Sequence, residues 1–252
     1  MPFKRLIPVL LIKEDGLIHR SKFDENTDLY VGDPINTINI FNDYEVDELI
    51  LLDISSRKLN KKINFSLLEE LAGEAFFPLA YGGFLKNIEE CEKIIKTGFE
   101  KIILNSCTLG NFNFLRECIR KLGSQSVILS LNLIRNENEY YIFDYMNNKI
   151  VNENLFDFIN FLNSLKVGEI LINSVNLDGT MNGCDKKLIE LFQNKLDVPL
   201  IYKGGIKNYK EIEDIFNYKI DAIASSTIFI MKKKGGGIVL NYPTGEEKNK
   251  FQ

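Results

Sequence analysis

The chain has 252 residues, of which 45% are hydrophobic and 26% are charged, so it is long enough to bury the core of one large domain. Its formal net charge of -4 argues against nucleic-acid binding, and no apolar run approaches the roughly 20 residues of a membrane span, which predicts a cytoplasmic protein without membrane contact. Four scattered cysteines and a single histidine, His19, lack the spacing of a metal site or a disulfide framework, so neither a metal nor a cofactor is expected.

Short apolar segments alternate along the chain with amphipathic segments. The predicted strands are residues 6–12, 48–52, 78–81, 101–105, 126–132, 169–174, 199–203 and 222–225. The predicted helices between them include residues 64–72, 88–97, 112–121, 155–165, 186–194 and 209–216. Apolar strands separated by helices imply a parallel sheet, and eight such units close into a (β/α)8 TIM barrel. No low-complexity linker interrupts the pattern, so residues 1–252 are predicted to form a single domain.

Three segments depart from this alternation. Residues 13–32 are predicted to form a polar loop that is long enough to act as a lid. Residues 139–144 alternate aromatic and polar side chains before Asn147-Asn148, which predicts a small hairpin inserted after the fifth strand. Gly235-Gly236-Gly237 and the apolar run after it disfavour a helix, so the tail, residues 231–252, is predicted to be non-helical, with a glycine hinge and an edge strand. That edge would pair either with a partner or with the chain's own barrel.

The two halves of the chain repeat each other at an offset of 121 residues. Residues 6–11 recur as 127–132, residues 49–52 as 170–173, and residues 78–83 as 199–205, while a fourth pair, 102–106 and 222–226, follows at an offset of 120. The repeat predicts a barrel built from two half-barrels, about 1–122 and 123–230.

Glycine turns follow the third and seventh predicted strands, at the end of a barrel where active sites lie. Gly82-Gly83 and Gly204-Gly205 allow a ligand to approach the backbone, and the amides of the next helix favour a phosphate. Polar donors follow the fourth and eighth strands, Asn105-Ser106 and Ser226-Thr227, and Asp178-Gly179 would complete the second site. A glycine pair also fits a tight turn that binds nothing. Two such sites together predict a ligand with a phosphate at each end.

Several motifs spread over residues 1–230 occur together in one known family. They are Ile7-Pro8, Gly32-Asp33-Pro34, Asp47-Glu48-Leu49 through Leu52-Asp53-Ile54, Gly82-Gly83, Gly123-Ser124-Gln125, and Ser174 through Asp178-Gly179-Thr180. In these motifs the chain resembles the cyclase subunit of imidazole glycerol phosphate synthase, a histidine-biosynthesis barrel made of two half-barrels. The resemblance implies an ammonia-using barrel that binds a doubly phosphorylated nucleotide at its top and docks a glutaminase subunit at its N-terminal face.

The chain departs from this family at the two catalytic positions. The family's catalytic aspartates correspond to Leu11 and Asn132, which are themselves 121 residues apart. A leucine cannot transfer a proton, and an asparagine amide does not titrate near neutral pH, so loss of either acid is expected to cost about 10²-fold to 10⁴-fold in acid-base catalysis. Lys203 and Asn173 stand where the family usually carries small hydroxyl residues. His19 stands where the family's first loop has a lysine, so it would either contact the ligand or be an exposed loop residue. Lys203 would bind a phosphate or carboxylate, react with a carbonyl, or simply line a wet pocket.

Charged residues are predicted at the opposite, N-terminal end of the barrel. Strand alternation places Arg5, Lys101 and Glu169 inside the barrel, with Glu48 at the start of the second strand. Buried charges persist only when they are paired, so a closed ring of ion pairs is expected. Such a ring would be a structural plug, or, as the resemblance implies, the salt-bridge gate of the ammonia passage. Glu100 matches an acidic residue of the family's glutaminase docking surface.

The combination of kept ammonia residues and lost acids resembles the paralogues of this cyclase in surface-polysaccharide clusters. They work with a glutaminase and a sugar amidotransferase to turn an acetamido group of a nucleotide-linked sugar into an acetamidino group. We therefore expect an ammonia-receiving subunit of a glutamine amidotransferase complex that acts on a phosphorylated or nucleotide-linked small molecule. The alternatives are an imidazole glycerol phosphate cyclase of histidine biosynthesis and a non-catalytic scaffold that activates the glutaminase.

Overall fold

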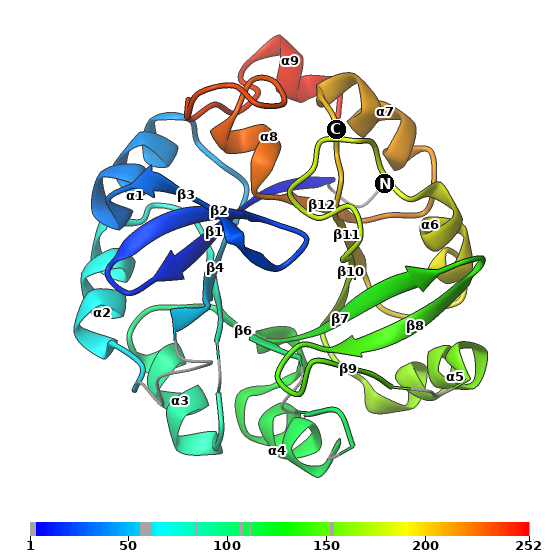
Figure 1. Cartoon of the computed structure of the whole chain (residues 1–252). Helices are drawn as coiled ribbons and strands as arrows, with labels where there is room; N and C mark the ends of the chain where they lie inside the picture. Colours follow the sequence, from blue (N-terminus) through cyan, green and yellow to red (C-terminus); the bar gives the residue numbers. More distant parts are fainter. Residues whose placement is uncertain are drawn as a thin grey trace.

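The core of the molecule is a closed barrel of parallel strands (Figure 1). The computed structural model describes residues 4–55, 62–83, 85–105, 108–110, 112–151 and 154–251. The barrel strands are β1 (Arg5–Lys13), β4 (Leu49–Asp53), β5 (Leu79–Gly82), β6 (Lys101–Leu104), β7 (Val127–Asn136), β10 (Glu169–Ser174), β11 (Leu200–Lys203) and β12 (Ala222–Ser225). Pairing of β1 with β12 and of β6 with β7 joins the two halves, and β7 also pairs with β10, so hydrogen bonds run around the whole circumference. The predicted (β/α)8 barrel is confirmed.

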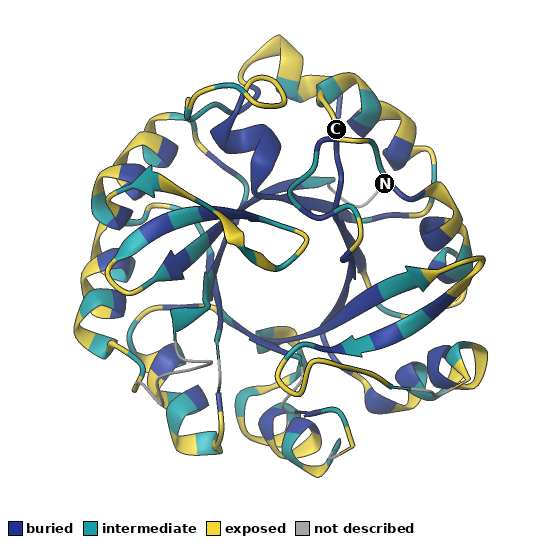
Figure 2. Cartoon of the chain, in the orientation of Figure 1, coloured by how far each residue is buried: buried dark blue, intermediate teal, exposed yellow. Residues whose placement is uncertain are grey.

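Helices surround the barrel and bury one face against the strands (Figure 2). They are α1 (Pro34–Asp43), α2 (Phe65–Glu74), α3 (Ile88–Lys96), α4 (Phe112–Leu122), α5 (Leu155–Leu165), α6 (Lys186–Phe192), α7 (Tyr209–Phe216), the short α8 (Thr227–Ile230) and α9 (Glu246–Asn249), with a 3-10 turn at η3 (Ser124–Ser126). Within the described part of the chain, no helix is both long and apolar enough to cross a membrane.

The 121-residue repeat extends to the helix caps. Asn87 Oδ1 accepts a hydrogen bond from Glu90 N at 2.9 Å, while Glu90 Oε2 accepts one from Lys86 N at 2.8 Å. Asn208 and Glu211 form the same reciprocal cap at the start of α7, at 3.0 and 2.7 Å. Because these side chains satisfy amides that a helix leaves free at its N-terminus, each cap defines where the helix after a glycine turn begins.

Two hairpins project over the C-terminal mouth of the barrel (Figure 1). The hairpin predicted after the fifth barrel strand is present, as β8 (Glu139–Asp144) and β9 (Lys149–Val151) extend antiparallel from β7. The stretch 13–32 was expected to be a loop, and this was wrong. It forms a second hairpin, β2 (Gly16–Ser21) and β3 (Asp24–Gly32), because β2 continues the antiparallel pairing of β1.

The C-terminal tail folds back on its own barrel, and the prediction that it is non-helical is wrong at α9, where four residues close a helical turn. The predicted edge strand does not form, because residues 238–243 make only isolated backbone bonds, from Val239 N to Ile230 O at 2.8 Å and from Asn241 N to Phe229 O at 2.9 Å. Tyr242 is buried, and its ring packs on Phe229 with centroids 5.3 Å apart. The tail therefore covers the barrel wall through side chains instead of through a β ladder.

Candidate functional site

Inward-pointing side chains form layers along the barrel axis. In β1, every second residue points inward, so the column reads Arg5, Ile7, Val9 and Leu11 from the N-terminal to the C-terminal end. Lys101 and Ile103 repeat this change from charged to apolar in β6, and β10 does the same. The result is a charged layer at the N-terminal end, an apolar middle and a mixed layer at the top.

The charged layer is a closed ring of four side chains. Arg5 contacts Glu48 at 2.6 Å and Glu169 at 2.9 Å, and Lys101 contacts the same two carboxylates at 2.9 and 2.8 Å. Although desolvation opposes ionisation, hydrogen bonds and attraction from Arg5 and Lys101 hold the pKa of Glu169 below its ordinary value. Glu100, beside Lys101, is exposed on the outer surface.

Above the ring, the barrel interior is apolar. Its buried members include Ile7, Val9, Ile50, Ala80, Ile103, Ile128, Leu171, Ile201, Ala222 and Ala224. Leu11 and Leu52 are partly buried and pack on this cluster from above. Such a layer offers nothing that holds a charge, so only a neutral molecule could enter it at low cost.

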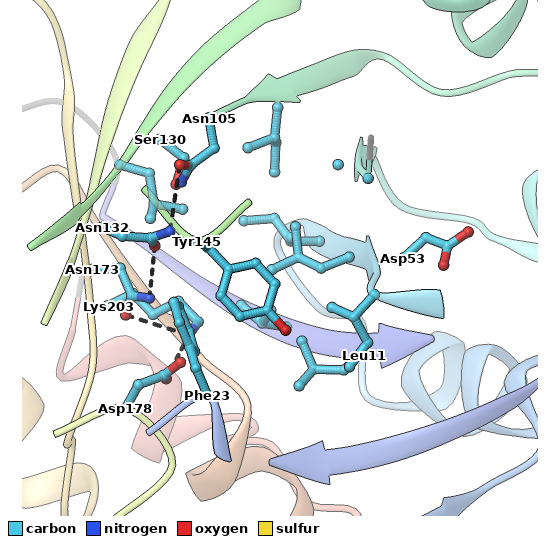
Figure 3. Close-up of a pocket in the computed structure, with 18 of the residues that line it drawn as sticks. Leu11, Phe23, Asp53, Asn105, Ser130, Asn132, Tyr145, Asn173, Asp178 and Lys203 are labelled. Carbon is cyan, nitrogen blue, oxygen red and sulfur yellow. Dashed lines mark hydrogen bonds and ion pairs between the residues drawn. The ribbon is translucent and has the colours of Figure 1, made fainter. Parts of the chain in front are cut away.

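A cavity of about 520 Å³ opens at the C-terminal mouth (Figure 3). Its floor is the apolar layer, since Val9, Ile50, Ile103 and Leu171 line both. Leu11 and Leu52, neighbours in register, form an apolar side wall. The opposite wall is polar, which makes the cavity two-sided.

The polar wall is a ladder of carboxamides. Asn173 Nδ2 donates to Asn132 Oδ1 at 3.3 Å, Asn132 Nδ2 donates to Asn105 Oδ1 at 3.4 Å, and Asn105 Nδ2 donates to Ser130 Oγ at 3.0 Å (Figure 3). Asn173 is the register partner of both Asn132 and Lys203, so neighbouring strands hold the ladder at one height. The ladder contains hydrogen-bonding groups but no acid or base that works near neutral pH.

Lys203 ends the ladder in a buried ion pair. Its ammonium lies 2.5 Å from Asp178 Oδ1 and 3.4 Å from Asn173 Oδ1. The side chains of Lys203 and Asp178 are only 5% and 9% exposed. The predicted Lys203 therefore lies in the cavity wall, but with its charge already paired.

The predicted phosphate residues divide into two groups. Gly82, Gly83, Asn105, Asp178 and Lys203 line the cavity, whereas Gly179, Gly204, Gly205, Ser226 and Thr227 do not, and Ser106 lies outside the described residues. A Cβ on Gly204 would lie 2.7 Å from Ser174 O, and one on Gly205 would lie 2.3 Å from Gly183 O. These two glycines therefore serve close backbone packing. Phosphate binding at either glycine turn stays a prediction.

The β2–β3 hairpin is held over the mouth by polar and aromatic contacts. Asp28 binds Arg20 at 2.6 Å and Lys13 at 2.6 Å, and Arg20 donates to the Tyr145 hydroxyl at 3.1 Å. Desolvation by burial raises the pKa of Asp28, but hydrogen bonds from Arg20 and Lys13 outweigh it and hold that pKa below its ordinary value. Phe23 meets Tyr145 edge-on with ring centroids 5.1 Å apart. The two hairpins thus contact each other above the cavity.

His19 points away from the cavity. It is 6% exposed, and its Nε2 lies 3.2 Å from Thr227 Oγ1 at the start of α8. The alternative of an exposed loop histidine is therefore wrong. Burial lowers the pKa of His19, so the imidazole is neutral at physiological pH.

Comparison with known proteins agrees with this architecture. A family model described as histidine biosynthesis protein matches residues 5–234. This chain belongs to that family. A Pseudomonas aeruginosa protein provisionally named imidazole glycerol phosphate synthase subunit hisF2 is 37% identical over 95% of this chain and 96% of its own length. A Vibrio vulnificus protein, provisionally named imidazole glycerol phosphate synthase subunit hisF3, is 34% identical over 98% of this chain and 95% of its own length. Subunit HisF of Petrotoga mobilis is 30% identical over 90% of this chain and 90% of its own length.

The chain is thus a HisF-like barrel of the histidine biosynthesis family, and the resemblance found in its motifs is confirmed at that level. Its ring and its cavity lie at opposite ends of one apolar interior. The positions of Leu11 and Asn132 face each other across the cavity, one on the apolar wall and one on the amide ladder (Figure 3).

Several cavity residues were missed by sequence reasoning. Ser130 could have been found, because it has the same inward parity as Asn132 two residues later. Arg20, Phe23 and Tyr145 had no such signal, since they reach the mouth through two hairpins whose approach depends on tertiary packing.

Proposed function

We propose that this chain is the ammonia-receiving subunit of a glutamine amidotransferase complex, with a glutaminase docked at its N-terminal face. Ammonia would pass the ring of Arg5, Glu48, Lys101 and Glu169, cross the apolar interior and leave through the cavity. The observation that carries this proposal is the order of layers along one axis: a charged ring, an apolar middle, and a cavity with leucine and asparagine at the two catalytic positions.

We further propose that the ammonia is used in the acetamidino modification of a surface-polysaccharide nucleotide sugar, with a sugar amidotransferase as the acceptor enzyme. The support is chemical. Leu11 and Asn132 cannot supply the proton transfers of imidazole ring closure, whereas a conduit needs none at these positions. The chemistry would then reside in the partner.

A second candidate is the cyclase of histidine biosynthesis, which the names of the similar proteins favour. The purified chain, assayed with the histidine-pathway nucleotide and an ammonium salt, decides between the two. We expect turnover at least about 10²-fold below that of an authentic cyclase subunit, with partial recovery in the Leu11→Asp/Asn132→Asp variant. Turnover at the authentic rate by the unchanged chain would support the cyclase and reject our main proposal.

The conduit itself is tested by charge reversal in the ring. In the complex with the glutaminase, Lys101→Glu places three carboxylates around Arg5, so glutamine-dependent product should fall while product made from added ammonium salt persists. Lys210→Glu, at an exposed residue of α7, is the matched surface control for charge reversal. Unchanged glutamine-dependent transfer in Lys101→Glu would contradict the passage and favour a scaffold that only activates the glutaminase.

A further inference from the structure

The chemistry of ammonia sets a requirement on the chamber where it leaves the barrel. In water at neutral pH most ammonia is protonated, and ammonium has no lone pair with which to attack an electrophile. A carboxylate in a partly buried chamber would favour ammonium, because an opposite charge nearby stabilises the charged form of a base. A chamber that passes ammonia on to a partner therefore keeps more of it nucleophilic when no buried carboxylate there lacks a countercharge.

The cavity wall meets this requirement at the positions nearest the apolar layer. Leu11 offers no charge, and Asn132 and Asn173 offer only neutral amide groups. The ladder also leaves each of these two amides with hydrogen-bonding capacity, since each is engaged through one donor and one acceptor atom in the ladder. Ammonia leaving the apolar floor thus meets neutral donors and acceptors.

Two carboxylates remain among the described residues that line the cavity, and they are placed differently. Asp53 lies across the cavity from the ladder, where it accepts hydrogen bonds from Ser55 N at 2.8 Å and from the Tyr81 hydroxyl at 3.4 Å (Figure 3). It is only partly buried, so solvent screens its attraction for ammonium. Asp178 lies on the ladder side and is buried, but the ammonium of Lys203 is 2.5 Å away. Lys203 occupies the place that an ammonium ion would take beside this carboxylate.

We propose that Lys203 neutralises Asp178 so that the exit chamber does not retain ammonium, and that the cavity passes ammonia in its neutral, nucleophilic form. This assigns Lys203 an electrostatic role in the proposed conduit, as a fixed cation of the protein in place of a bound one. The inference rests on the proposed function, but it concerns the isolated barrel and is tested there.

The test compares thermal denaturation of the isolated chain in ammonium chloride and in sodium chloride at equal ionic strength. The unchanged chain should show no ammonium-specific stabilisation. Asn132→Asp and Lys203→Met each leave an unpaired carboxylate in the chamber, so ammonium should raise their Tm by about 2–4 °C over sodium. The double variant Lys203→Met/Asp178→Asn carries neither charge and should again show no difference.

Three results would overturn the proposal. They are ammonium-specific stabilisation of the unchanged chain, its absence in Asn132→Asp, or stabilisation of the unchanged chain by inorganic phosphate that Lys203→Met abolishes. The last result would make Lys203 an anion-binding residue. Asn132→Asp keeps the test decisive if Lys203→Met does not fold. Failure of glutamine-dependent transfer with these binding results intact would reject the conduit and leave the electrostatic role of Lys203 standing.

Discussion

Single residues in this barrel acquire their properties from the charges placed opposite them. Glu48 is 2% exposed, yet it contacts both Arg5 and Lys101, so its burial is offset by two cations. Lys203 is also buried, and among the described residues Asp178 is the one carboxylate that forms an ion pair with it. The N-terminal ring thus shares its charges among four side chains, whereas the top of the barrel has an isolated pair.

Removing one member of the ring should destabilise the fold. Glu48→Gln leaves Arg5 and Lys101 with one shared carboxylate, and an uncompensated buried charge costs about 3–5 kcal/mol. The free energy of unfolding, measured by urea denaturation, should fall by that amount. Glu100→Gln, an exposed neighbour, should change it by less than about 0.5 kcal/mol. Equal effects of the two variants would show that the ring adds nothing specific.

The pH dependence of stability should report His19. Its pKa is lowered in the folded state, so the unfolded chain binds the proton more readily. The contribution of His19 is therefore fully present above the ordinary histidine value of about 6.5 and is lost as the pH falls through the lowered pKa. Tm should fall between pH 7.5 and 5.5 and fall less in His19→Gln. Identical dependence of Tm on pH in the unchanged chain and in His19→Gln would contradict this. The pKa values of Asp28 and Glu169 are also lowered, so the stability that these two carboxylates contribute is lost only at more acidic pH.

At the scale of elements, the hairpins and the tail decide what covers the barrel. The β2–β3 hairpin reaches the other side of the mouth, where Ser21 Oγ donates to Gly179 O at 2.9 Å and Lys22 N donates to Asp178 O at 2.8 Å. Gly179 has φ 75°, and a Cβ there would lie 2.5 Å from Arg20 O. Glycine at position 179 therefore lets the β2–β3 hairpin pack directly on the backbone there. This packing explains why Gly179 does not line the cavity.

The tail is held at the start of two ring-bearing strands. The Tyr242 hydroxyl donates to Leu6 O at 2.9 Å and accepts from Asp47 N at 3.2 Å, and both backbone groups lie next to ring residues. Tyr242→Phe leaves them unsatisfied and should cost about 1–3 kcal/mol of stability in thermal denaturation. Tyr30→Phe is the control, because Tyr30 is 66% exposed and should be near neutral. A neutral Tyr242→Phe would mean that the tail is held by its ring packing alone.

For the whole molecule, closure couples the two halves. The β1–β12 and β6–β7 ladders cross between them, so neither half keeps its sheet edges paired when the other unfolds. We expect a single cooperative transition, with calorimetric and van't Hoff enthalpies that agree. Two resolved transitions in calorimetry would instead indicate half-barrels that fold independently, as the internal repeat alone would allow.

Much of the layered interior followed from the sequence, because strand alternation and the 121-residue repeat are periodic along the chain. Alternation placed Arg5, Lys101 and Glu169 on the inside, and the repeat paired Leu11 with Asn132. The sequence by itself therefore determined the barrel, the order of its layers and the absence of both acids. Only the tertiary structure decided that Lys203 pairs with Asp178, that His19 is buried against Thr227, and that the tail folds back. These outcomes depend on contacts between segments far apart in the chain, which no local pattern encodes.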